Sequence, residues 1–289
     1  MVIIESGGRR VVVDDGHGAL ILSIEDVDGT ELLAGGNPPI PALRPLRDLA
    51  ATGYRGWIDC FPSIEPEADS TNGRGELQLA GHGELWWRSW KVDHSSEHEV
   101  GLSCRLEELG VVYTRRVSLG TEALVVSSTI SNRADVPVNY VWASHPLLAA
   151  DDSTWMELAD SEVTRWPQVD DEGERLDAVW PADSARRHWT DLPTGTAVKV
   201  FMPWPAEGVT FSTGGRDRHL AFRIEGEHRA PYLGLWINRG GFPSDSPLYH
   251  FAIEPTVGST DSLRTSVEHG TAGVLAGGAS VSLEVVLTF

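Results

Sequence analysis

Alternation of apolar and polar residues along most of the chain predicts short β-strands. Residues 281–289 place an apolar side chain at every second position, and residues 124–131 alternate between an apolar face and a wetter one. Residues 2–5, 9–14 and 19–27 show similar short apolar segments, separated by glycine-containing turns that favour hairpins. The pattern therefore predicts an all-β protein whose strands are joined by tight turns.

Glycine and proline support this prediction. The chain has 30 glycines and 17 prolines among 289 residues, which favours many turns over long helices. A chain of this length forms either one large all-β domain or two smaller ones. No repeat of about 20 to 50 residues is visible, which weighs against propellers and β-helices.

Charge and hydropathy narrow the class of partner. With 23 lysines and arginines against 42 aspartates and glutamates, the net charge is −19, which repels phosphate backbones and anionic lipids. No segment approaches the roughly 20 apolar residues of a membrane span, and no signal peptide is recognisable. Cys60 and Cys104 are too few for a disulfide framework. We therefore expect a cytoplasmic protein with reduced thiols that binds neither nucleic acid nor membrane, and a homodimer is left open.

Two predicted strands end in an ionisable residue that directly precedes a proline. Glu254 lies on the more polar face of its strand, and Pro255 is expected to end that strand. His145 occupies the same kind of position before Pro146. Both side chains are candidates for acid–base chemistry at the rim of a sheet. A surface glutamate beside a turn and a core histidine bonded to the backbone are the simpler alternatives.

Other candidates lie in loops or on a strand face. His82 stands between two glycines, which let the backbone approach a ligand, although a plain turn residue is the simpler alternative. Trp236 is one of 11 tryptophans, and an indole either fills a core or stacks on the apolar face of a sugar ring. Asp59 is flanked by Trp57 and Phe61, which could wall a pocket.

Together, His82, His145 and Glu254 supply the groups of an acid–base pair. Opening a cyclic hemiacetal requires a base that takes a hydroxyl proton and an acid that protonates the ring oxygen. We expect proximity to lower the pKa of Glu254 and to raise that of His145, with the two groups about one sugar ring apart. A zinc or iron site is the weaker alternative, because the sequence has no HxH pair or HExxH helix.

The order and setting of these residues resemble the aldose 1-epimerase, or galactose mutarotase-like, family. The resemblance consists of the His-Gly pair at His82, the strand-ending His145 and the segment IEPTVGSTDSL that contains Glu254. It implies one domain over residues 1–289, folded as the family's large antiparallel β-sandwich, or supersandwich, that binds a carbohydrate without metal or organic cofactor. It further implies that Glu254 takes the anomeric hydroxyl proton, His145 protonates the ring oxygen and His82 orients the sugar.

The chain departs from the family pattern upstream of His82. The usual Asn-Arg segment reads DCFPSIEP here, so the arginine that contacts substrate is not placed. Arg74 is a candidate by position, and Asp59 is a further candidate substrate contact, in a role that would differ from the family's. Three functions follow: an epimerase of free aldoses, an epimerase of hexose 6-phosphates, and a carbohydrate-binding protein without turnover. The phosphate-binding variant would draw on several arginines, namely Arg44, Arg47, Arg55, Arg74 and Arg88.

Overall fold

Two large antiparallel sheets make up most of the computed structural model, which describes residues 1–35, 55–72, 75–158, 186–226, 229–245 and 247–289. The first sheet has nine strands in the order β1-β2-β3-β4-β12-β20-β19-β16, with β13 paired to β20. Their bounds are β1 Val2–Ser6, β2 Arg9–Asp14, β3 Leu20–Glu25, β4 Trp57–Cys60, β12 Trp142–Pro146, β13 Leu148–Ala149, β16 Thr196–Pro203, β19 Tyr232–Arg239 and β20 Tyr249–Val257.

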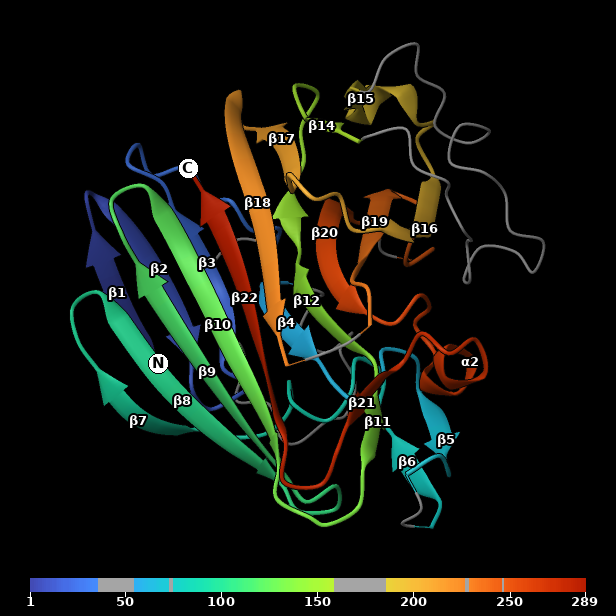
Figure 1. Cartoon of the computed structure of the whole chain (residues 1–289). Helices are drawn as coiled ribbons and strands as arrows, with labels where there is room; N and C mark the ends of the chain where they lie inside the picture. Colours follow the sequence, from blue (N-terminus) through green and yellow to red (C-terminus); the bar gives the residue numbers. More distant parts are fainter. Residues whose placement is uncertain (36–54, 73–74, 159–185, 227–228, 246) are drawn as a thin grey trace.

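The second sheet also has nine strands, in the order β15-β14-β17-β18-β22-β10-β9-β8-β7. In Figure 1, β8, β9, β10, β22 and β18 lie side by side in front of β1 to β3. The bounds are β7 Lys91–Ser95, β8 Glu99–Leu106, β9 Val111–Leu119, β10 Ala123–Asn132, β14 Trp155–Glu157, β15 Arg186–His188, β17 Val209–Thr213, β18 Arg216–Glu225 and β22 Ser280–Thr288.

Smaller elements cover one end of the sheets. Two small two-stranded sheets, β5 with β6 and β11 with β21, lie near a short helix, α2, which Ser262 caps by accepting from the Thr265 amide. The bounds are β5 Glu67–Asp69, β6 Leu77–Leu79, β11 Val138–Tyr140, β21 Gly273–Leu275, α2 Leu263–Glu268 and a 3-10 turn at Trp189–Asp191. Within the described ranges, no helix is long and apolar enough to cross a membrane.

The hydrophobic core lies between the two large sheets and is built by alternation. In β10, Leu124, Val126, Ser128 and Ile130 are buried while the intervening residues are half-buried, as the sequence predicted. Apolar residues of both sheets form one contiguous cluster, and burial of each large one contributes about 1.5 to 3 kcal/mol. The predicted all-β architecture with two packed antiparallel sheets is therefore confirmed.

Strand β20 corrects one prediction. Pro255 does not end the strand, which runs on to Val257. The reason is the position of Pro255 along the edge of β20 that faces β12 and β13. β20 pairs with β13 at His250 and Phe251, and with β12 only at Thr256 and Val257, which leaves a gap at residues 252–255. In that gap, the missing N–H of Pro255 removes no ladder bond to β12 or β13. Glu254 lies in the same gap.

Candidate active site

Glu254 lies on the face of the first sheet that points away from the interlayer core. Its neighbours Ile253 and Phe251 pack into that core, so alternation directs Glu254 to the opposite side. The carboxyl group is fully buried. Oε2 accepts a hydrogen bond from Lys199, and Oε1 lies 3.5 Å from Nε2 of His145. The face predicted for Glu254 is therefore correct, and two cationic or titratable groups meet it there.

His145 and His82 lie against each other beside this carboxyl group. His145 is on β12, which neighbours β20 in the sheet (Figure 1), and it is only 6% exposed. The ring of His82 meets that of His145 edge-on, with centroids 5.3 Å apart. The structure thus brings together three residues that are more than 60 positions apart from one another in sequence.

A tight turn holds His82 in place. His82 has a φ of +61° and Gly83 a φ of +80°, both in the left-handed region. A Cβ at Gly83 would lie 2.2 Å from the carbonyl oxygen of Phe61, so only glycine fits this approach. The amide of His82 donates to the carbonyl of Ile64 at 2.6 Å. Gly83 therefore serves the backbone geometry that presents the imidazole, whereas a side chain at Gly81 would meet only Pro66, at 3.7 Å.

Two charged residues of the site, Lys199 and Asp261, were not predicted from the sequence. Lys199 is on β16 and only 3% exposed, and its Nζ lies 3.6 Å from Oδ1 of Asp261. Asp261 follows β20 and is 2% exposed. Their signals were weak, since a lysine between Val198 and Val200 normally marks the solvent face of a strand. Asp261 lies in the segment IEPTVGSTDSL, which carries the family resemblance, but the resemblance gives no role to this aspartate.

Burial and ion pairing shift the pKa values of these charged groups in opposite directions. Burial raises the pKa of Glu254 above its usual value, although Lys199 opposes this shift. Burial likewise raises the pKa of Asp261, against the opposing effect of Lys199. Burial acts to lower the pKa of Lys199, but Asp261 and Glu254 outweigh it and raise that pKa. Lys199 therefore keeps its proton at neutral pH.

The histidines behave contrary to the prediction from sequence. Burial, followed by repulsion from Lys199, holds the pKa of His145 well below its usual range. Burial, followed by the electrostatic effects of His145 and Lys199, does the same for the pKa of His82. The sequence predicts that the pair lowers the pKa of Glu254 and raises that of His145. Both shifts have the opposite sign, because desolvation is the largest effect and Lys199 takes the position of the cation.

Glu254, His145, His82, Lys199 and Asp261 are called the Glu254 cluster below. Several buried polar atoms of this cluster lack a hydrogen-bond partner among the described residues. They are Oε1 of Glu254, Oδ1 of Asp261 and Nδ1 of His145. Each unsatisfied buried polar group costs about 1 to 3 kcal/mol. Such a group of acceptors favours a ligand that brings hydroxyl or amide donors.

Trp236 lies on the same face of the sheet as Glu254. It pairs with Ala252, and Glu254 pairs with Gly234, two residues along β19. The indole donates to Nε2 of His250 at 3.0 Å and meets Phe242 edge-on at 6.1 Å. The side chain is half-buried. Its role as a platform for a sugar ring remains a prediction.

Asp59 corrects the prediction of a contact with substrate. On β4 it alternates with Ile58, which pairs with His145, so Asp59 points into the core between the sheets. Its Oδ2 accepts hydrogen bonds from Tyr113 and Ser128 at 2.8 Å each. The carboxyl group therefore serves an interlayer network. Arg74, the other predicted contact, lies outside the described residues.

The described residues contain no group of three or more histidine, cysteine, aspartate or glutamate side chains that could hold a metal ion. Cys60 and Cys104 are buried free thiols. Burial, with the Glu254 carboxylate as the next cause, raises the pKa of Cys60 well above its usual value. The ionisable groups that meet at Glu254 and Lys199 are carboxyl, imidazole and ammonium groups.

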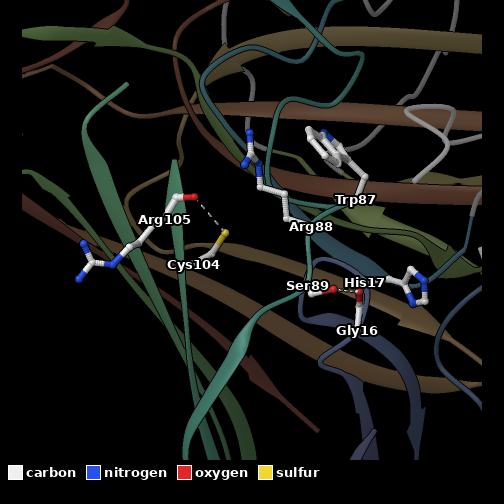
Figure 2. Close-up of a pocket in the computed structure, with 7 residues that line it drawn as sticks. All are labelled: Gly16, His17, Trp87, Arg88, Ser89, Cys104 and Arg105. Atoms are coloured by element: carbon white, nitrogen blue, oxygen red, sulfur yellow. Dashed lines mark hydrogen bonds between the residues drawn. The ribbon is translucent and has the colours of Figure 1, made fainter. Parts of the chain in front are cut away.

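A separate pocket of about 440 Å³ opens elsewhere, between the β2–β3 turn, the segment after the His82 turn and β8. Figure 2 shows that His17, Arg88 and Arg105 point in different directions rather than toward a common point. Arg88 is committed to Glu84 and Glu108, with Nη2 at 3.4 and 3.3 Å from their carboxylates. None of the residues of the Glu254 cluster lines this pocket.

Comparison with solved structures identifies the fold. A galactose mutarotase-like protein from Lactobacillus casei superposes with a TM-score of 0.70 at 19% identity, covering 100% of this chain and 99% of that one. The chain has the galactose mutarotase-like fold. An Escherichia coli K12 protein provisionally named an aldose 1-epimerase gives a TM-score of 0.72 at 17% identity, covering 99% of this chain and 97% of that one.

A third structure, a galactose mutarotase related enzyme from Lactobacillus acidophilus, gives a TM-score of 0.67 at 16% identity, covering 99% of this chain and 96% of that one. No family model matches the sequence, and no curated protein does. The resemblance inferred from the sequence is thereby confirmed at the level of the fold.

Proposed function

We propose that this protein is an aldose 1-epimerase, which interconverts the α and β anomers of a free sugar. The observation that carries the proposal is the meeting of His82, His145 and Glu254 on one face of the first sheet, with Glu254 Oε1 lying 3.5 Å from His145 Nε2. In this proposal Glu254 is the base for the anomeric hydroxyl. Burial raises the pKa of Glu254 and so brings that pKa closer to neutral pH. A general base is most effective when its pKa lies near the pH at which the enzyme works.

The short distance between Glu254 and His145 suits this reaction. The sequence predicts that the two groups lie about one sugar ring apart, and the 3.5 Å between Oε1 and Nε2 corrects that prediction. The anomeric hydroxyl oxygen and the ring oxygen are bonded to the same carbon, so the groups that serve them must also be neighbours. In our proposal, one sugar edge meets Oε1 of Glu254, while His145 and His82 contact the adjacent oxygens.

The unsatisfied atoms of the cluster favour a neutral polyhydroxyl ligand. Oε1 of Glu254 and Oδ1 of Asp261 are acceptors that sugar hydroxyl groups can satisfy. With Lys199 protonated and both carboxyl groups ionised, the cluster carries a net charge of −1 (one positive and two negative groups). We therefore propose a free aldose rather than a sugar phosphate. Of the arginines considered for a phosphate, Arg44, Arg47 and Arg74 lie outside the described residues, and Arg88 lines the separate pocket.

Polarimetry on a panel of hexoses and pentoses tests the proposal. We expect the wild-type protein to accelerate anomerisation of at least one sugar, and Glu254→Gln to lower kcat by about 10²- to 10⁴-fold, since it removes the base. Glu122→Gln, which alters an exposed carboxylate in the turn between β9 and β10, is the matched control and should leave kcat unchanged. The variant Glu254→Gln should still bind the sugar in calorimetry.

Two outcomes contradict the proposal. If wild-type protein binds a sugar but does not accelerate its anomerisation, the chain is a carbohydrate-binding protein instead. If Glu254→Gln anomerises as fast as the wild type, Glu254 is not the base.

A further inference from the structure

Lys199 is a buried cation at the centre of the proposed site. It lies on β16, whose partner strand β19 separates it from β20, and its register partner is Trp236. Its side chain is only 4% exposed. Burial of an ammonium group costs several kcal/mol unless charged partners compensate. Glu254 and Asp261 supply that compensation, from β20 and from the loop that follows it.

The ammonium group has donor capacity left for a ligand. Of its three N–H bonds, one is donated to Oε2 of Glu254. Oδ1 of Asp261 lies 3.6 Å away and has no hydrogen-bond partner among the described residues. The ring of Phe201 covers another side, 5.3 Å from Nζ. An oxygen atom of a bound sugar could therefore accept a proton or a hydrogen bond from Nζ while another meets Oε1.

The other titratable groups around Lys199 are poor proton donors at neutral pH. His145 on β12 and His82 in the His-Gly turn are held neutral by burial and by Lys199 itself, which keeps their pKa values low. Cys60 on β4 is a buried thiol with a raised pKa. Glu254 and Asp261 are the two carboxylates that face the ammonium. Among these groups, only Lys199 holds a positive charge from which a proton can leave.

We propose that Lys199, rather than His145, is the acid that protonates the ring oxygen of the sugar. This inference rests on the proposed epimerase function. The proton of the anomeric hydroxyl passes to Oε1 of Glu254, and the C1–O1 bond becomes a double bond. The C1–O5 bond breaks with its electron pair moving to O5, and O5 takes a proton from Nζ of Lys199. Ring closure on either face of the aldehyde reverses both transfers, so no proton or electron is gained or lost overall.

The charge balance favours this route. Before ring opening, the three groups carry +1 on Lys199 and −1 each on Glu254 and Asp261. Afterwards the amine is neutral, Glu254 is protonated and Asp261 remains charged. The net charge of the buried cluster is therefore −1 throughout. A route that begins with protonated His145 would need a second cation beside Lys199, and two like charges among buried side chains repel strongly.

The pH dependence of the wild-type enzyme tests the inference without any substitution. A lysine acid predicts that kcat/KM rises as Glu254 loses its proton and then stays level to at least about pH 9, because lysine keeps its proton to about pH 10 even in water. A fall in kcat/KM as the pH rises through about 6 to 7 would assign the acid to a histidine and overturn the proposal.

Substitutions give an independent test. We expect Lys199→Met to lower kcat by about 10²- to 10⁴-fold at every pH, with sugar affinity changed much less. Lys199→Arg keeps the charge but holds its proton too tightly, so kcat should fall as well. The matched control is Lys91→Met, at an exposed lysine on β7.

Recovery of kcat in Lys199→Met at higher pH would show that Lys199 only keeps Glu254 ionised, and full activity in Lys199→Arg would show that charge alone suffices. Either result overturns the acid role while leaving the epimerase function intact. Absence of anomerisation by the wild-type protein would reject the function itself.

Discussion

His250 shows how burial decides the protonation of single residues at this face. It is 3% exposed and accepts a hydrogen bond from the Trp236 indole at 3.0 Å. Burial lowers its pKa to about 4. The ring is therefore neutral at neutral pH, which suits an acceptor that holds the indole in place.

This low pKa predicts a measurable effect on stability. Between about pH 6.5 and the folded-state pKa of about 4, the unfolded chain binds a proton that the folded protein does not, so stability falls as the pH falls. Replacement of His250 by glutamine removes this proton. We expect the loss in the free energy of unfolding between about pH 7 and about pH 4.5 to shrink by about 2 kcal/mol, measured by urea denaturation. The exposed His98→Gln is the control, and an equal loss in His250→Gln and the wild type would contradict the account.

At the residue scale, the sequence identified side chains by their setting. Glu254 and His145 stood out because each precedes a proline, and His82 because it lies between glycines. Lys199 could not be found in this way, since an isolated lysine in an apolar strand looks like a solvent-facing residue until tertiary contacts bury it. The direction of the pKa shifts was missed for the same reason, because burial depends on neighbours from other strands.

Among the elements, the His-Gly turn shows most clearly how backbone geometry serves the site. Gly83 combines a φ of +80° with a close approach to the backbone of Phe61. The turn also bonds to the segment before β5, through the amide of His82 and the carbonyl of Ile64. The position of the imidazole is therefore coupled to two neighbouring segments.

A glycine substitution separates these two constraints. Gly83→Ala introduces both left-handed strain and a clash with the Phe61 carbonyl, so we expect more than about 2 kcal/mol of lost stability together with a raised KM. Gly29→Ala also has a positive φ, of +81°, but its Cβ would meet nothing within 4 Å. It should cost only about 1 kcal/mol and leave KM unchanged. Equal costs in thermal unfolding for the two variants would show that the close approach is unimportant.

Element types were predictable because alternation is local, whereas strand ends and partners were not. Pro255 looked like a strand terminator, yet β20 continues because its neighbours β12 and β13 leave a gap at that residue. The same uncertainty affected Asp59, since all four residues of β4 are buried and alternation alone does not say which face meets substrate.

For the whole molecule, a charged network links the two sheets behind the site. Asp59 of the first sheet faces Arg115 of the second, with Oδ1 3.5 Å from Nη2, and the arginine side chain is fully buried. Arg115 also donates to the carbonyl of Ala19 at 2.9 Å. Loss of one partner in such a pair leaves a buried charge without compensation.

We therefore expect Asp59→Asn to destabilise the fold without changing catalysis. The free energy of unfolding in urea should fall by about 3 to 5 kcal/mol. In the fraction that stays folded, kcat and KM should match those of the wild type, because Asp59 faces away from Glu254. The exposed Asp93→Asn is the control and should cost less than about 1 kcal/mol. A loss of kcat comparable to that of Glu254→Gln would restore Asp59 to the site.

The most direct test of the central claim is exchange between the α and β anomeric protons of a sugar, followed by magnetisation-transfer NMR at neutral pH. We predict exchange in the presence of the wild-type protein well above the buffer rate for at least one aldose, and a return to the buffer rate with Glu254→Gln although that variant still binds the sugar. Undiminished exchange with Glu254→Gln, or no exchange with the wild type for any aldose it binds, would contradict the claim that the Glu254 cluster catalyses anomerisation.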